Sequence, residues 1–206
     1  VNVLLKSNEL ILPSGKWDII EMEWINGTTL GGEIKQLVEQ RDSNGIRRLS
    51  EEFEKLARAM VLAEVSHGDI SPENLMVRGG RIVLIDYDSF WSKELAKIPC
   101  PVGATKLQHP DVPKTLGRLA DRVAFAIFKL GFSVLIENIA NFTSKDTCLE
   151  GHRFVFDVDS LIKGDPLVKF IPDREKPLYE LLMSVLGGSY ERVEELDEFL
   201  FPELRH

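Results

Sequence analysis

The longest apolar segment of the chain places the strongest constraint on its fold. Residues 123–136 (VAFAIFKLGFSVLI) are interrupted only by Lys129 and Ser133. A membrane-spanning helix needs about 20 apolar residues, so this segment is too short to cross a bilayer. We therefore expect a deeply buried helix, begun by Asp121, in the core of a soluble protein. A length of 206 residues with 44% hydrophobic content is enough for such a core, in one or two domains.

Charge and cysteine usage narrow the class of protein. The net charge of −8 argues against nucleic acid or an anionic membrane as the main partner. Cys100 and Cys148 lie far apart without metal-ligand spacing, which favours free thiols in a reducing compartment. The start, VNVLLKSNEL, lacks the charged region and long apolar core of a signal peptide. These features predict a cytoplasmic protein.

The first part of the chain predicts two strands and then two helices. Residues 1–25 read as two strands joined by a Pro-Ser-Gly turn. A short helix is expected over residues 31–40, followed by a loop over residues 41–48. Ser50 has the features of an N-cap, and apolar residues recur at helical spacing from there to Val65.

The second part predicts a hairpin, a long irregular segment and a helical end. Residues 75–77 and 81–86 read as short strands around an Arg-Gly-Gly turn. Residues 89–117 are rich in proline and show little periodicity, and long segments of this kind are commonly functional. Two further helices are expected over residues 177–186 and 191–201. The order of elements indicates an α+β fold dominated by helices.

Three oxygen-bearing side chains are spaced as a phosphoryl-transfer site requires. Asp69 and Asn74 share the loop HGDISPEN, and Asp86 ends the second strand of the hairpin that follows. The hairpin brings the chain back, so the three side chains can meet in one cleft. Such a site must hold Mg²⁺ on phosphates, with carboxylate and amide oxygens, and must orient an attacking hydroxyl.

HGDISPENLMV followed by LIDYD resembles the catalytic loop and the metal-binding loop of the protein-kinase-like superfamily. The resemblance implies that Asp69 is the catalytic base, that Asn74 and Asp86 bind Mg²⁺, and that His67 is a structural residue of the loop. The combination of HGD, IDYD and QHP is most similar to bacterial kinase-like proteins. The implied architecture is a mostly helical C-lobe over residues 26–206.

Residues 1–25 resemble the end of an N-lobe followed by the hinge. In IIEMEWINGTTL, Met22 stands at the gatekeeper position, and the backbones of Glu23 and Ile25 stand where the adenine of ATP is bound. ATP and Mg²⁺ are therefore the implied cofactors.

Three further positions have structural counterparts in the family. Asp111, in His-Pro-Asp, stands where kinases have the Glu of Ala-Pro-Glu, and Arg192 is placed to pair with it. Asp121 resembles the Asp that opens the buried central helix and braces the catalytic loop.

The chain departs from the family pattern at several points. Asp88 replaces the glycine of the metal-binding loop, as a further metal ligand or as a solvated turn residue. Ser71 occupies the catalytic-loop position where many Ser/Thr kinases have a Lys. No Gly-rich loop and no Lys–Glu pair precede the hinge, and Lys6 reads as an ordinary strand residue. The N-lobe is thus expected to be truncated, and the chain to be weakly active or inactive alone.

Three functions fit these features. The first is ATP- and Mg²⁺-dependent phosphoryl transfer to a Ser/Thr hydroxyl of a protein substrate. The second is a pseudokinase scaffold that binds a partner protein, with homodimerisation through the surface left by the missing N-lobe. The third is a small-molecule kinase of the aminoglycoside or choline type, which is disfavoured because residues 27–66 have room for only two helices.

Overall fold

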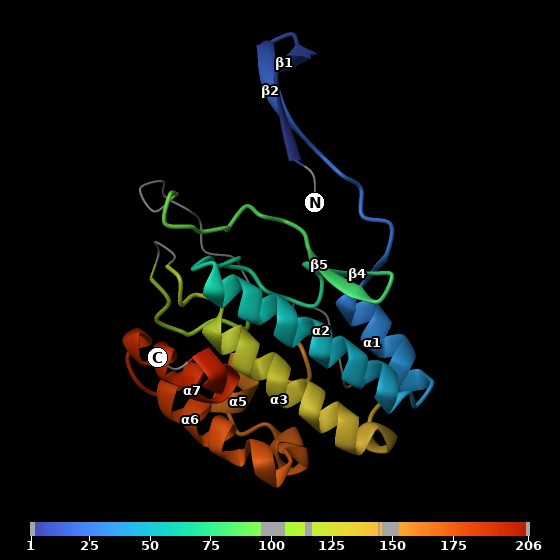
Figure 1. Ribbon diagram of the computed structural model, residues 1–206, viewed down its shortest axis with the longest axis vertical. Helices are drawn as coiled ribbons and strands as arrows, with labels where there is room; N and C mark the ends of the chain where they lie inside the picture. The colour runs from blue at the N-terminus through green and yellow to red at the C-terminus, as the bar shows by residue number, and fades with distance from the viewer. Residues whose placement is uncertain (1–2, 96–105, 114–116, 144, 146–152, 205–206) are drawn as a thin grey trace.

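The computed structural model describes residues 3–95, 106–113, 117–143, 145 and 153–204. The fold is α+β, as predicted: helices form the body, and two small sheets lie toward the N-terminal end of the chain. Figure 1 shows that the first sheet projects from the body at one end of its longest axis. The second sheet lies against the helices.

The projecting sheet is an antiparallel hairpin of β1 (Val3–Leu12) and β2 (Gly15–Met22), which confirms the predicted strand pair. The pairing shifts register between Lys6 and Leu10, so β1 contains a bulge. Within the bulge Asn8 has a φ of 60°, and its N–H donates a hydrogen bond to the Asp18 carboxylate at 2.8 Å. Short polar side chains tolerate this left-handed backbone better than apolar ones.

The second sheet has the strand order β3-β4-β5, with β3 (Thr28–Thr29), β4 (Leu75–Arg78) and β5 (Arg81–Leu84). The predicted hairpin is confirmed, and Gly79 and Gly80 form its turn with φ values of 58° and 78°. Gly27 crosses close to β4, because a Cβ there would collide with the carbonyl oxygen of Val77. These contacts join the chain that leaves the first hairpin to the body.

Helices α1 (Leu30–Glu39) and α2 (Ser43–Leu62) follow. The predicted loop over residues 41–48 and the N-cap at Ser50 are wrong. Asp42 caps α2, since its carboxylate accepts a hydrogen bond from the N–H of Gly45 at 2.8 Å. Ile46 is fully buried, so the apolar stripe of this helix begins before Ser50.

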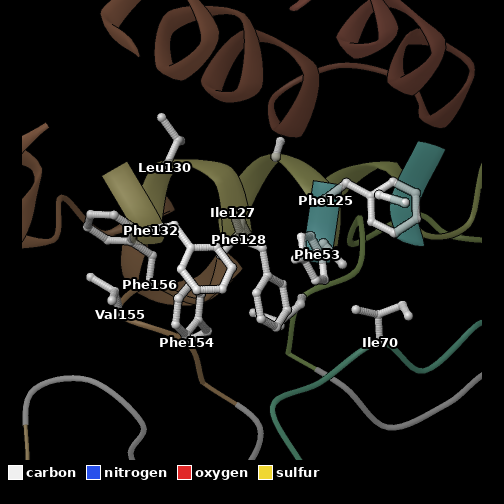
Figure 2. Packing of buried hydrophobic residues seen from close by; sticks show 14 of the residues in the cluster. Phe53, Ile70, Phe125, Ile127, Phe128, Leu130, Phe132, Phe154, Val155 and Phe156 are labelled. Atoms are coloured by element: carbon white, nitrogen blue, oxygen red, sulfur yellow. The ribbon is translucent and has the colours of Figure 1, made fainter. Parts of the chain in front are cut away.

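The predicted central helix is α3 (Arg122–Asn138), and an aromatic stack fixes it in the core. The Phe128 ring lies between Phe53 of α2 and Phe154, with centroid distances of 4.4 and 4.5 Å (Figure 2). The expectation that this segment is too short to cross a membrane is wrong: by length and composition the helical stretch Arg122–Asn141 would suffice, and it is the only such helix in the described ranges. Because 67% of its apolar window is buried, this stretch packs as a core helix does.

Short helices complete the C-terminal part. The predicted helix over residues 177–186 is confirmed, whereas residues 191–201 form a 3₁₀ helix and then one short α-helix. Val193 and Leu196 are fully buried and three positions apart, which matches the three residues per turn of a 3₁₀ helix. The elements are η1 (Ile139–Asn141), α5 (Val158–Ile162), η2 (Pro166–Phe170), η3 (Asp173–Glu175), α6 (Lys176–Leu186), η4 (Tyr190–Leu196), α7 (Asp197–Leu200) and η5 (Pro202–Leu204).

Candidate functional site

The loop HGDISPEN is held by Asp121, the residue that directly precedes the central helix α3. The Asp121 carboxylate accepts hydrogen bonds from the backbone N–H groups of His67 and Gly68, at 2.6 and 2.9 Å. The Asp121 side chain makes no capping hydrogen bond to the backbone of α3. Asp121 is 2% exposed, so this link between helix and loop is inside the protein.

Buried charges surround this link. Burial raises the pKa of the Asp121 carboxyl, while the hydrogen bonds from the loop and the charge of Arg122 oppose that shift. Arg122 is also buried, and its Nε lies 2.6 Å from a carboxylate oxygen of Asp197. Burial likewise raises the pKa of Asp197, and Arg122 opposes it. The base of the loop is therefore tied electrostatically to the C-terminal segment.

The same loop is held from two other directions. The side-chain amide of Gln108 donates a hydrogen bond to the carbonyl oxygen of Gly68, whose φ is 76°. The Nε2–H of His67 donates to the carbonyl oxygen of Ile85 at 2.9 Å, since a carbonyl can only accept. His67 is fully buried, so it positions the loop and has no access to a substrate.

Asp69 and Asn74 are in direct contact. The side-chain nitrogen of Asn74 donates hydrogen bonds to the carbonyl oxygen and to the carboxylate of Asp69, at 2.9 and 3.0 Å. This leaves the amide oxygen of Asn74 available to a cation. Ser71 is fully buried, and its hydroxyl and carbonyl oxygens accept from the backbone N–H of Asn74 at 3.3 and 3.2 Å. Ser71, at the catalytic-loop position where many Ser/Thr kinases have a Lys, therefore shapes the turn with a buried hydroxyl.

Asp86 follows β5 and is placed beside this loop by the backbone. The N–H of Ile85 donates to the carbonyl oxygen of Asn74 at 3.0 Å. Asp86 is exposed and has a φ of 62°, a left-handed conformation that is uncommon for a residue other than glycine. Asp88, two residues later, is exposed as well.

A pocket of about 510 Å³ lies between the linker after β2 and the β4–β5 hairpin. The residues predicted for nucleotide binding, Met22, Glu23 and Ile25, line it together with Asp86. The remaining lining residues are Trp24, Met76 and Ile85. Asp69, Asn74 and Asp88 are not among the lining residues. Asn74 is joined to the lining residue Ile85 by a backbone hydrogen bond, and Asp69 contacts Asn74. The walls are mostly apolar, and Glu23 and Asp86 are the two acidic residues of the lining. The apolar walls suit a flat heterocycle, and an anionic group attached to it would need a cation between it and Asp86.

The protein oxygens at this site could hold Mg²⁺ only together with the phosphate oxygens of a bound molecule. Within the described ranges, no group of three or more His, Cys, Asp or Glu side chains is arranged to hold a metal ion. Asp86 offers an exposed carboxylate and Asn74 an amide oxygen, which are hard oxygen donors of the kind Mg²⁺ prefers. Phosphate oxygens and water would have to complete the shell, as is usual for Mg²⁺ in nucleotide sites.

The predicted pair of Asp111 and Arg192 is not formed. Arg192 makes two hydrogen bonds to the Glu195 carboxylate, both at 2.8 Å, and further bonds to Ser184. Asp111 is exposed, and its N–H donates to Nδ1 of His109 at 3.0 Å. The Nε2–H of the buried His109 donates to the carbonyl oxygen of Val185 at 3.0 Å, so His109 anchors this segment and not Asp111.

Sequence reasoning missed Gln108 as a residue that contacts the site. The triplet QHP contains it, but no local pattern shows that its amide reaches a loop 40 positions earlier. A scan against models of known protein families finds no match for this chain, and a search of curated proteins finds no relative. The functional argument therefore depends on the geometry of the site.

Proposed function

We propose that this chain has a protein-kinase-like fold and binds ATP with Mg²⁺ in the pocket between the linker and the β4–β5 hairpin. The observation that carries the proposal is the composition of that pocket. Met22, Glu23 and Ile25 were assigned to the adenine and Asp86 to the metal from separate motifs, and all four line one pocket of about 510 Å³. Adenine would lie against the apolar walls, with the phosphates directed toward Asp86.

The proposed roles follow from which atoms are available. Mg²⁺, when bound, supplies positive charge that neutralises the phosphates of the nucleotide. Asp86 and the amide oxygen of Asn74 would hold the ion. Asp69 is half-buried next to Asn74, and it would accept the proton of an attacking hydroxyl. The hydrogen bond from Asn74 fixes the orientation of the Asp69 carboxylate.

The substrate class we propose is a Ser/Thr hydroxyl of a cytoplasmic protein. Support comes from the segment between Ser89 and Asp111, which resembles an activation segment. The buried His109 anchors the end of that segment to α6. We expect slow turnover or none from these 206 residues alone, because phosphoryl transfer also requires a Lys–Glu pair on the phosphates.

A thermal-shift titration with ATP tests this proposal, with and without Mg²⁺. Ligand at about a hundredfold excess over its Kd stabilises the native state by about 2.7 kcal/mol, so binding is measurable without turnover. We expect a Mg²⁺-dependent rise in Tm that Asp86→Ala abolishes. Asp88→Ala should retain the rise if Asp88 is a turn residue and weaken it if Asp88 is a further metal ligand. Asp111→Ala is the matched control, since Asp111 is an exposed carboxylate outside the pocket.

A second candidate is a scaffold that binds a partner protein without turnover. The observation that favours it is the exposure of apolar side chains on the β1–β2 hairpin. No rise in Tm with ATP at millimolar concentration, in the presence or absence of Mg²⁺, would contradict the kinase proposal and favour the scaffold. A small-molecule kinase gains no support, because the chain between Gly27 and Ser66 holds only β3, α1 and α2.

A further inference from the structure

One buried cation, Arg122, interacts with two carboxylates at the start of the central helix. Arg122 is the first residue of α3 and Asp121 precedes it, and both are 2% exposed. The second carboxylate belongs to Asp197 in α7, and one of its oxygens lies 2.6 Å from the Nε of Arg122. Removing charged groups from water is costly, so the arrangement of these three side chains is strongly constrained.

Both oxygens of Asp121 are used by the loop. One accepts from the N–H of His67 at 2.6 Å, and the other accepts from the N–H of Gly68 at 2.9 Å. In the part of the chain that the structure describes, no hydrogen bond or ion pair joins the side chains of Arg122 and Asp121. A guanidinium has five N–H donors and binds carboxylates strongly, so the separation of these two neighbours needs a cause.

The position of Asp197 supplies that cause. Asp197 belongs to the C-terminal segment, residues 190–204, and its carboxylate is the ion-pair partner of Arg122. The Cζ of Arg122 also lies 6.0 Å from the ring centroid of Phe125. That ring meets Phe201 of the same segment edge-on, with a centroid distance of 6.3 Å. The guanidinium is therefore held beside the C-terminal segment.

Arg122 still has N–H groups to offer. Among the described residues, its Nε and Nη1 have no partner that satisfies hydrogen-bond geometry, although Nε is close to Asp197. A buried donor without an acceptor is unfavourable. Loss of the Asp197 charge would therefore turn Arg122 toward the carboxylate beside it in the chain, Asp121.

We propose that Asp197 is a positioning residue, which holds Arg122 away from Asp121. Both oxygens of Asp121 then remain with the backbone N–H groups of the loop, and Gly68 stays in place. Gly68 directly precedes Asp69, so the importance of this role for catalysis rests on the proposed function, in which Asp69 is the base. The positioning itself involves no nucleotide.

Hydrogen exchange of single amides, followed by NMR at neutral pH, tests the proposal. In Asp197→Asn we expect the amides of His67 and Gly68 to exchange about tenfold faster or more, because they lose a charged acceptor. Amides in the middle of α2 separate this local effect from a change in overall stability. Glu194→Gln is the matched control, since it breaks an exposed ion pair with Arg118 in the same region, and both loop amides should then exchange as in the wild type.

The double variant Arg122→Met/Asp197→Asn shows whether the released cation causes the damage. It removes the guanidinium together with the carboxylate that holds it, and an apolar replacement of a buried ion pair is often tolerated. We expect urea denaturation to find it more stable than Asp197→Asn, with protection of His67 and Gly68 restored. A double variant no more stable than the single one would overturn the proposal, and so would loop amides in Asp197→Asn that exchange as in the wild type.

The stability comparison remains decisive if Asp197→Asn does not fold. A folded double variant would then support the proposal, and an unfolded one would overturn it. Neither measurement uses nucleotide, so the two proposals fail separately. If ATP gives no rise in Tm while the exchange pattern holds, the kinase proposal fails and the role of Asp197 stands. If ATP binds and the exchange pattern is absent, the reverse is true.

Discussion

The side-chain amide of Gln108 donates a hydrogen bond to the carbonyl oxygen of Gly68, and the N–H of Gly68 donates to the Asp121 carboxylate. Gly68 is thus held by both of its backbone polar groups, and Gln108 is only 8% exposed. The residue after Gly68 is Asp69, the proposed base. Loss of either hydrogen bond at Gly68 would therefore also displace its neighbour Asp69.

Gln108→Ala should lower the free energy of unfolding by about 1–3 kcal/mol, because it leaves the buried carbonyl of Gly68 without its donor. Urea denaturation measures this loss. Gln36→Ala is the control, since Gln36 is exposed on α1, and its effect should stay within about 0.5 kcal/mol. Equal stability of the two variants would show that the bond from Gln108 contributes nothing to the loop.

Substitutions of Asp86 should separate backbone strain from ligand binding. Its φ of 62° is unfavourable for alanine and unstrained for glycine. We therefore expect Asp86→Ala to destabilise the protein by about 1 kcal/mol and Asp86→Gly to be close to neutral. Both variants should lose the Mg²⁺-dependent rise in Tm with ATP. Chemical denaturation without ligand gives the stability, and the thermal-shift titration gives the binding.

Asp86→Gly is the informative member of this pair, because it removes the carboxylate without disturbing the backbone. A glycine variant that still shows the full Mg²⁺-dependent shift would exclude Asp86 as a metal ligand. A glycine variant as unstable as the alanine variant would instead show that the carboxylate stabilises the loop end.

The features that the sequence predicted correctly depend on local signals. The two hairpins follow from turn residues between apolar runs, and the central helix follows from its apolar length. The start of α2 was wrong because Ser50 followed by two glutamates looks like an N-terminus. Burial of Ile46 and capping by Asp42 extend the helix beyond it. Tertiary burial overrides a local capping signal in such cases.

Sequence reasoning missed two kinds of contact. Some join residues far apart in the chain, and others form because a nearer partner replaces the expected one. Arg192 bonds Glu195, three residues away, and not the more distant Asp111. A side chain that finds a carboxylate on its own helical turn loses less freedom than one that reaches across the fold. Gln108 has no pattern that distinguishes it from a surface glutamine, and only the folded chain brings it to Gly68.

Tyr190 should make stability fall at alkaline pH. Burial raises the pKa of Tyr190 to about 12, and the nearby Asp121 adds to the shift. The unfolded chain has the ordinary value of about 10. Because the pKa of Tyr190 is higher in the folded protein, its contribution to the free energy of unfolding is complete below about pH 10 and is lost as the pH rises toward 12. The loss should be about 1–2 kcal/mol, because the side chain is only partly buried.

Tyr190→Phe tests this directly. Its hydroxyl is buried, and it has no hydrogen-bond partner within the part of the chain that the structure describes. Removing it should therefore leave stability at pH 7 unchanged or slightly higher. Unfolding of both proteins in urea, compared from about pH 9 to pH 11.5, isolates Tyr190, since all other groups titrate alike in the two. Parallel pH profiles would contradict the assignment.

Gly131 in α3 should be intolerant of any larger residue, although alanine is the better helix former. A Cβ at this position would lie 2.5 and 2.9 Å from ring carbons of Phe154, closer than real Cβ contacts. The ring cannot retreat easily, because it stacks on Phe128 at 4.5 Å and leans on Phe132 at 5.0 Å (Figure 2). Overpacking of this kind costs about 1–3 kcal/mol, against a gain in helix propensity of about 1 kcal/mol.

We therefore expect Gly131→Ala to lower the free energy of unfolding by up to about 2 kcal/mol in urea denaturation. Gly187→Ala is the matched control, because the nearest atom to its Cβ, the carbonyl oxygen of Met183, would be at an ordinary 3.6 Å. That variant should stay within about 0.5 kcal/mol of the wild type. If Gly131→Ala proved as stable as Gly187→Ala, the Phe154 ring would not be packed tightly against α3, and the aromatic stack would not be what holds this helix in the core.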